Sequence, residues 1–171
     1  MIFDPYVVSG AGDKMSVIIR RMRRSDAERT TRAPVWQTDW TSAYIETSPY
    51  EKYAVETADG ELIALGMYEA LESALVVRVV YMESQPESNP TLAGAKRKYS
   101  GIGKLMIAYG IKLSIDHGFG GDVILEAKTD ALATHYREDF GGIELPVFDG
   151  GAPRFLIQGE AAKHIFFGYL K

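Results

Sequence analysis

The feature that most constrains the fold is a run of three β-segments in the middle of the chain. Residues 53–57 and 62–68 are apolar and β-branched, and they flank Asp59-Gly60, a dipeptide that tolerates the positive φ values of a short hairpin turn. Residues 75–82 (LVVRVVYM) are apolar enough for an interior strand. Because strands joined by such short turns pair antiparallel, the centre of the chain predicts an antiparallel sheet.

Helical patterns alternate with further strands on both sides of these segments. Residues 1–14 lack periodicity, so we expect an N-terminal arm that packs late or stays loose, followed by one domain over residues 15–171. The order of elements predicts a mixed α/β (α+β) fold with a central sheet flanked by helices. Outside the middle of the chain we expect strands at 15–20, 123–127, 154–158 and 164–170, and helices at 27–32, 35–47, 103–117 and 131–139.

Composition excludes several classes of protein and site. The chain has no cysteine, which excludes disulfides, thiolate metal ligands and a cysteine nucleophile. Its net charge of −4 gives no globally basic surface, so a nucleic-acid partner is disfavoured. No apolar run approaches the roughly 20 residues of a membrane span. The first residues carry acidic side chains without a basic segment, so we expect no secretory signal and a cytoplasmic location.

Familiar phosphate and metal motifs fail on inspection. A Walker loop ending at Lys104 would need glycine where Lys98 stands and a hydroxyl where Leu105 stands. A dinucleotide fingerprint would need a third glycine at Met106. The three histidines are dispersed, so we expect no metal.

A glycine-rich segment, Lys98-Tyr-Ser-Gly101-Ile-Gly103-Lys104, opens the strongest helical pattern in the chain. Two glycines allow a ligand to approach the backbone, and the free amides of a helix N-terminus attract anions. We therefore predict a site for a phosphate-bearing ligand. A plain turn with a solvated basic rim remains the alternative. The cations beside the loop are Lys96, Arg97, Lys98 and Lys104.

The order from Lys98 to Gly142 is glycine loop, long helix, buried strand, and short helix with a tyrosine before Phe-Gly. It resembles the acetyl-CoA-binding core of the general N-acetyltransferase (GNAT) superfamily. The family signature R/Q-x-x-G-x-G/A matches Lys98-x-x-Gly101-x-Gly103, with lysine in the first position. Neighbouring strands also follow the family order, so the resemblance covers most of residues 15–170. The segments YMESQPESN, KYSGIG and EAKTDALATHY are similar to a bacterial subgroup of that family.

The resemblance implies a GNAT-like single domain in which a V-shaped splay between two strands holds coenzyme A. The strand at 75–82 would diverge from the strand at 123–127 and pair with the pantetheine arm, while the glycine loop binds the pyrophosphate. Acetyl-CoA is then the cosubstrate. The implied cofactor-binding residues are Tyr81, Met82, Lys98, Tyr99, Ser100, Gly101, Ile102, Gly103 and Lys104.

Two residues are candidates for catalysis. Glu83, at the end of the third strand, is positioned for a general base, or it is a solvated carboxylate that begins a loop. Tyr136 corresponds to the family's general acid, or it is a core aromatic residue. Because Tyr136 precedes Gly141 by five residues rather than four, a strict match to the family spacing would place Arg137 there instead.

The resemblance assigns the first two helices to the acceptor side. Trp36, Trp40 and Tyr44 are spaced to form one helical stripe, which either packs on the sheet or forms an acceptor wall or the face of a homodimer. Arginines precede them, on a solvated helix face or on a docking surface for an acidic acceptor or RNA. They are Arg20, Arg21, Arg23, Arg24, Arg29 and Arg32.

The function implied by the resemblance is N-acetyl transfer from acetyl-CoA to a small-molecule or peptide amine. Direct transfer in a ternary complex is favoured because no cysteine is present to carry the acyl group. One alternative is a non-catalytic acyl-CoA sensor or regulatory protein on the same fold. Another is a protein-interaction module whose glycine loop is only a turn.

Overall fold

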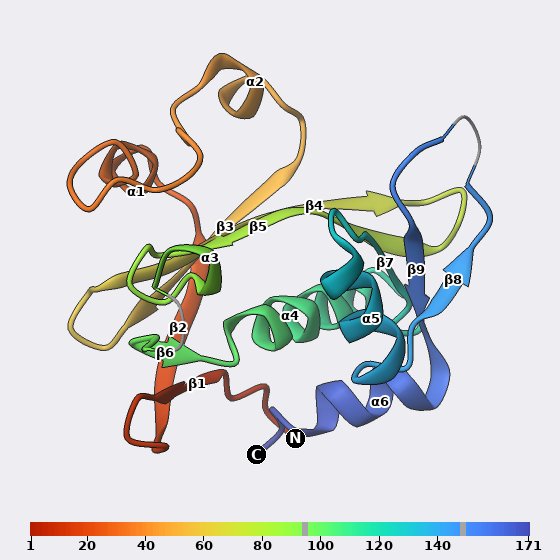
Figure 1. The fold of residues 1–171 in the computed structure, drawn as a ribbon. Coiled ribbons are helices and arrows are strands. Elements are labelled where there is room, and N and C mark those ends of the chain that lie inside the picture. Colours follow the sequence, from red (N-terminus) through yellow and green to blue (C-terminus); the bar gives the residue numbers. More distant parts are fainter. Residues whose placement is uncertain (94–95, 148–149) are drawn as a thin grey trace. The chain divides into compact units, whose positions relative to one another are not determined.

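The structure, a computed structural model, describes residues 1–93, 96–147 and 150–171, and Figure 1 labels its elements. It divides into two compact units. Unit 1 comprises residues 1–3, 68–80 and 106–171, and unit 2 comprises residues 4–67 and 81–105. The chain passes from one unit to the other four times, once between residues 3 and 4 and once each within β4 (Leu62–Leu71), β5 (Val76–Ser84) and α4 (Ile102–Asp116).

Unit 2 contains antiparallel strands. Their order is β6 (Tyr99–Ser100), β1 (Tyr6–Ser9), β2 (Lys14–Arg21), β3 (Glu51–Thr57) and β4. β2 pairs with β3 in a register that runs from Val17↔Thr57 to Arg21↔Tyr53. Between β3 and β4, Gly60 has a φ of +88° and donates its N–H to the Thr57 carbonyl. The expected hairpin is confirmed.

The first residues of the chain form part of this sheet. β1 pairs antiparallel with β2 on one side and with β6 on the other, and Val7 is fully buried. Of the two alternatives for the arm at residues 1–14, the one in which it stays loose is therefore wrong for residues 6–9. A four-residue strand is too short to show periodicity in the sequence, whereas pairing on both sides satisfies its backbone groups.

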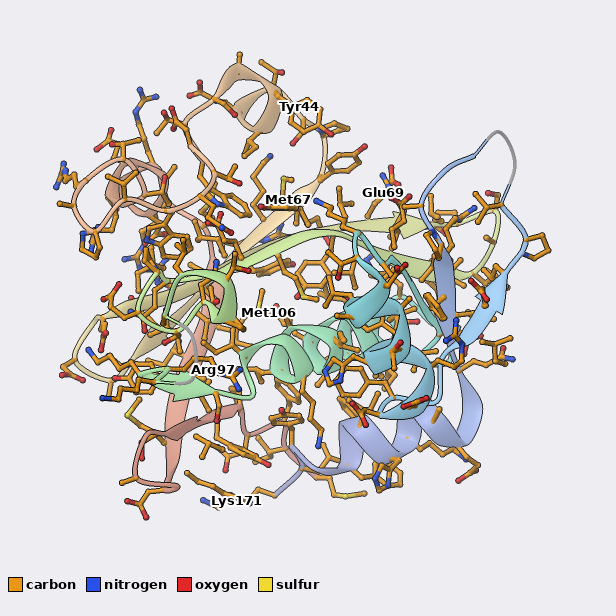
Figure 2. All side chains as sticks on the ribbon, in the orientation of Figure 1. Tyr44, Met67, Glu69, Arg97, Met106 and Lys171 are labelled. Carbon is orange, nitrogen blue, oxygen red and sulfur yellow. The ribbon has the colours of Figure 1, made fainter. Side chains whose placement is uncertain are left out.

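The helices of unit 2 are short: α1 (Arg24–Arg29), α2 (Ala43–Glu46) and α3 (Pro90–Ala93). The helix expected at 35–47 is wrong except at α2. Trp36 and Trp40 are buried, but Tyr44 is 73% exposed (Figure 2), so the three aromatic residues do not form one helical face. Their spacing comes from a segment of turns that buries two indole rings.

Unit 1 contains the parallel strand pair. Its strand order is β4, β5, β7 (Val123–Glu126), β9 (Arg154–Ile157) and β8 (Ile143–Leu145). β5 pairs parallel with β7 from Val77↔Val123 to Val79↔Leu125, and β9 pairs antiparallel with β7 and with β8. Because β5 continues to Ser84, its pairing with β7 ends partway along the strand, as the expected splay requires.

Helix α4 confirms the helix expected at 103–117 and approaches the strands of unit 1 through a glycine. A Cβ atom added at Gly110 would lie 3.3 Å from side-chain atoms of Tyr68 and Val79. The Tyr68 hydroxyl donates a hydrogen bond of 2.7 Å to the Met106 carbonyl. Gly110 therefore allows close packing of helix on sheet, and the buried hydroxyl has its partner.

The remaining helices of unit 1 are α5 (Asp130–Glu138) and α6 (Gly159–Phe167). The strand expected at 164–170 is wrong, because this segment begins inside α6. Its aromatic residues favour a strand locally. Ala162, Ile165 and Tyr169 are buried, however, and their spacing of three and four residues is that of a helix face.

The fold is mixed α/β, with a mostly antiparallel sheet flanked by helices, as the sequence predicts. The one parallel pair recorded in the described residues joins β5 and β7. Within that part of the chain, no helix combines the length and apolar character needed to cross a membrane.

Candidate functional site

The glycine loop presents open backbone at the start of α4. Gly101 has a φ of +79°, a conformation that favours glycine, and α4 begins at the next residue. Nothing lies within 4 Å of a Cβ atom built on Gly101 or Gly103. The first amides of a helix have no helical acceptor and carry the positive end of the helix dipole. The loop therefore has the features of an anion cradle.

Two of the amides predicted to bind pyrophosphate are already occupied. The Lys98 N–H donates to the Glu87 carbonyl at 2.9 Å. The Tyr99 N–H donates to Ser88 Oγ at 3.1 Å. The cradle therefore narrows from residues 98–104 to the amides at the start of α4, which are those of Ile102, Gly103 and Lys104.

The Lys98 side chain lies against a carboxylate that the sequence analysis did not identify. Glu61 accepts from Lys98 Nζ at 2.6 Å, from the Tyr99 hydroxyl at 2.9 Å and from Gln85 Nε2 at 3.0 Å. Burial opposes ionisation of Glu61, but these hydrogen bonds together hold its pKa below the usual range. The hydrogen bond to Glu61 raises the pKa of Lys98. The charge of Lys98 is thus balanced within the protein.

Glu83 is buried, with 7% exposure, and accepts hydrogen bonds from three N–H donors. Its Oε1 accepts from the Trp40 indole at 2.9 Å. Its Oε2 accepts from the backbone N–H groups of Gln37 and Thr38, at 2.7 and 3.4 Å. The carboxylate therefore anchors residues 37–40, a role that is neither of the two considered from the sequence.

Tyr81 lies beside this anchor on β5. Its hydroxyl is 2.8 Å from Thr38 Oγ1, and its ring is tilted against that of Trp40 with centroids 5.6 Å apart. Burial raises the pKa of Tyr81, and the nearby Glu83 charge adds to this shift. Unit 2 thus brings Tyr81 and Glu83 together around residues 37–40.

The segment after β5 braces the same unit with buried polar side chains. Ser88 Oγ donates to Gln85 Oε1 at 2.8 Å, and the Gln85 N–H donates to the Ile63 carbonyl. Asn89 Nδ2 donates to Gln37 Oε1 at 3.0 Å. These hydrogen bonds connect the Glu61 cluster, the loop and the segment that Glu83 anchors. The sequence QPESN gives no clear signal of this role, because Gln, Ser and Asn are equally typical of exposed loops.

Tyr136 belongs to unit 1 and lies on α5, whose N-cap Thr129 accepts from the Leu132 N–H at 3.1 Å. The tyrosine is 3% exposed, with its ring against Phe140 and Phe155. Burial raises its pKa, so the hydroxyl keeps its proton at neutral pH. Among the residues that the structure describes, that hydroxyl has no hydrogen-bond partner.

The alternative at this position, Arg137, has a different environment. Its side chain is half exposed and lies 3.4 Å from the Glu144 carboxylate. A guanidinium keeps its proton in proteins and is a poor acid. Of the two neighbours, Tyr136 therefore has the chemistry of a proton donor. In the described ranges no cluster of three or more histidine, aspartate or glutamate side chains is arranged to hold a metal ion.

Comparison with known sequences gave no matching family profile and no matching curated protein. Comparison with solved structures gave acetyltransferases. The spermidine/spermine N-acetyltransferase SpeG from Vibrio cholerae aligns with a TM-score of 0.57 at 16% identity, over 87% of this chain and 95% of its own. The chain has the GNAT fold. Nourseothricin acetyltransferase aligns with a TM-score of 0.54 at 15% identity, over 82% of this chain and 97% of its own. At such identities the likeness establishes the fold alone.

Proposed function

We propose that the chain is an N-acetyltransferase that moves the acetyl group of acetyl-CoA directly to an amine acceptor in a ternary complex. The observation that carries this proposal is the open set of amides at the start of α4, in the position where the GNAT fold binds the coenzyme. The acceptor is a small-molecule or peptide amine. A homodimer is part of the same proposal, and sedimentation velocity tests it.

The chain offers two kinds of contact to the coenzyme. The amides of Ile102, Gly103 and Lys104 would bind the pyrophosphate, because they are the free donors of the loop. The backbone of β5 at Tyr81 and Met82 lies beyond the last β5–β7 pair, so its edge would bind the amide-rich pantetheine arm. When bound, acetyl-CoA supplies a thioester carbonyl that an amine can attack.

Three groups of the chain would each have one catalytic role. A carboxylate has about four lone-pair sites, and three donors occupy the oxygens of Glu83, so one site remains to accept the amine proton through water. An N–H group at Tyr81 or Met82 would stabilise the negative charge that develops on the acetyl oxygen. Tyr136 would give its proton to the thiolate as the C–S bond breaks and the C–N bond forms.

The test combines calorimetry of acetyl-CoA with an assay of thiol release over a panel of amines. Tyr136→Phe and Glu83→Gln should each lower kcat about 100-fold, the scale of general acid–base catalysis, and leave the acetyl-CoA Kd unchanged. Tyr44→Phe is the matched control, because Tyr44 is exposed, and it should leave kcat unchanged. Wild-type kcat in either test variant removes that residue from the mechanism.

A second function is favoured by one observation, which is the engagement of Glu83 by three N–H donors. A carboxylate with a purely structural role suits a protein that binds acyl-CoA and regulates a partner. Such a protein would bind acetyl-CoA in calorimetry and release no thiol with any amine in the panel. Turnover with one amine eliminates this function.

A further inference from the structure

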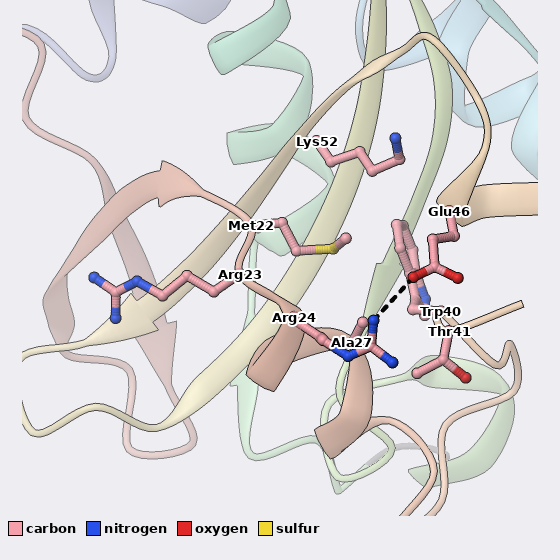
Figure 3. A pocket seen from close by; sticks show the side chains of 8 residues that line it. All are labelled: Met22, Arg23, Arg24, Ala27, Trp40, Thr41, Glu46 and Lys52. Atoms are coloured by element: carbon pink, nitrogen blue, oxygen red, sulfur yellow. Dashed lines mark hydrogen bonds and ion pairs between the residues drawn. The ribbon is translucent and has the colours of Figure 1, made fainter.

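Unit 2 contains a cavity of about 200 Å³ in the region that the resemblance gives to the acceptor side, and the proposed function assigns no ligand to it (Figure 3). It is formed where the end of β2, the helix α1, the segment around α2 and the start of β3 meet. Three of its lining residues are cationic and one is anionic. The residues that line it are Met22, Arg23, Arg24, Ala27, Trp40, Thr41, Glu46 and Lys52.

Of the three cationic residues that line the cavity, Lys52 is the one whose ammonium group is held by backbone carbonyl oxygens and not by a carboxylate. Its Nζ donates to the Ser48 carbonyl at 3.1 Å and to the Tyr50 carbonyl at 3.2 Å. In the part of the chain that the structure describes, no aspartate or glutamate forms an ion pair with it. An ammonium group has three N–H donors, so one remains beyond these two bonds. The charge of Lys52 is therefore unbalanced at the cavity.

The apolar part of the lining comes from three side chains. Trp40 is 1% exposed and its indole N–H is committed to Glu83, so its ring closes the wall of the cavity and leaves almost no surface for a ligand to contact. Met22 and Ala27 add a thioether and a methyl group. A thioether packs well against a flat ring. The cavity thus combines an apolar wall with a single unbalanced positive charge.

The cavity's one carboxylate is itself paired. Arg24 lies 3.1 Å from Glu46, across the opening, and both side chains are more than half exposed. Arg24 also lies 3.1 Å from Glu28, so it offsets only part of the Glu46 charge, and in the described residues no ion pair joins Glu46 to Lys52. The third cation, Arg23, extends away from the other lining side chains in Figure 3. A variant of Arg23 is therefore a matched control, because it removes a positive charge near the cavity and leaves the charge inside it unchanged.

We infer that this cavity binds a small molecule with one apolar ring and a carboxylate, whose oxygens receive the free N–H of Lys52 while the ring packs on the Met22 thioether. The volume sets the size, because drug-sized pockets have about 300–1,000 Å³ and a cavity of about 150 Å³ holds a benzene ring. The lining of the site includes none of the residues proposed to bind acetyl-CoA, so ligand binding there can be measured without the coenzyme.

The test uses phenylacetate and its neutral analogue phenylacetamide as probes in ligand-observed NMR and calorimetry of the full chain without coenzyme. Phenylacetate should bind at least tenfold more tightly than phenylacetamide, because only the carboxylate pairs with Lys52. Equal affinity of the two probes, or no binding of phenylacetate at about 10 mM, a level at which weak millimolar binding is detectable, overturns the proposal.

Four variants test which charged side chain binds the carboxylate. Lys52→Met should weaken phenylacetate at least tenfold, and Arg23→Gln should leave its Kd within twofold. Glu46→Gln should tighten phenylacetate two- to fivefold, because it removes the cavity's carboxylate and frees Arg24. Weaker phenylacetate binding in Glu46→Gln would mean that the Glu46 carboxylate supports the site instead of opposing the anion, and this result overturns the proposal. Lys52→Arg keeps the charge and should bind within threefold of wild type, so loss of binding in Lys52→Met is separated from loss of folding.

Discussion

Lys98 and Lys52 are both in unit 2, yet their ammonium groups are held in opposite ways. Lys98 is paired with the Glu61 carboxylate, which raises its pKa. Lys52 is held by two carbonyl oxygens, and burial lowers its pKa. The comparison shows that a basic residue beside a glycine loop is not by itself an anion ligand. At the loop the free donors are amides, whereas at the α1–α2 cavity the free donor is a side chain.

The largest effect should come from blocking the loop amides. Gly101→Val places a branched side chain at a φ of +79° beside the start of α4, and we expect acetyl-CoA to bind at least about 100-fold more weakly in calorimetry. The matched control is Gly118→Val, because Gly118 has a φ of +80° and equally open surroundings.

The two valine variants should lose similar stability, since the backbone strain is the same, and their thermal unfolding measures that cost. Only Gly101→Val should lose coenzyme affinity. Equal acetyl-CoA affinity in the two variants would mean that the pyrophosphate binds elsewhere.

An intermediate effect should follow from removing the carboxylate that holds Lys98. Glu61→Gln leaves the donors of Lys98 and Tyr99 without their anionic acceptor, so we expect a loss of about 2 kcal/mol in the free energy of unfolding at pH 7. Urea-induced unfolding of the variant and of the wild type measures this loss of free energy. Lys52→Met, at a lysine without a carboxylate partner, should lose less.

The same variant tests the pH dependence. The folded pKa of Glu61 lies below its unfolded value, so its stabilisation is complete above the unfolded pKa of about 4.3 and is lost as the pH falls through the folded pKa. The difference in unfolding free energy between wild type and Glu61→Gln should therefore shrink below about pH 4. A difference that is constant from pH 7 to pH 3 would contradict the assignment.

The smallest effect should come from Lys98 itself. Lys98→Met should weaken acetyl-CoA only about fivefold, because the exposed ammonium is already balanced by Glu61 and its removal leaves that negative charge near the loop. The double variant Lys98→Met with Glu61→Gln removes both charges and should return to within twofold of wild type in the same calorimetric assay. A loss of about 100-fold in Lys98→Met would make its side chain, rather than the amides, the main ligand.

Structural features that depend on residues close together in the chain could be predicted from the sequence. The hairpin at Asp59-Gly60 and the helix after the glycine loop depend on residues that are neighbours in the chain, and both are confirmed. The cradle was predicted for the same reason, since glycines and free helix amides are local features. Its extent was overestimated, because the acceptor of the Lys98 amide, the Glu87 carbonyl, is contributed by a separate segment.

Contacts between residues that are far apart in the chain could not be predicted from the sequence. The segment at 35–42 was predicted as a helix, but its N–H groups donate to Glu83, more than forty residues further along the chain. The Glu61–Lys98 pair spans 37 residues in the same way. At 164–170 aromatic residues favoured a strand, and the burial that selects α6 involves tertiary packing. The carbonyls around Lys52 show no sequence signal, because any residue can supply a carbonyl group.

The hydrogen bond between Trp40 and Glu83 also gives the protein an optical reporter. The chain has two tryptophans, both are buried, and one donates its indole N–H to this carboxylate while its ring lines the cavity beside Lys52. A change in the Glu83 carboxylate or in cavity occupancy alters the surroundings of one chromophore. The near-ultraviolet circular dichroism of the intact chain can therefore follow the anchor and the cavity without a label.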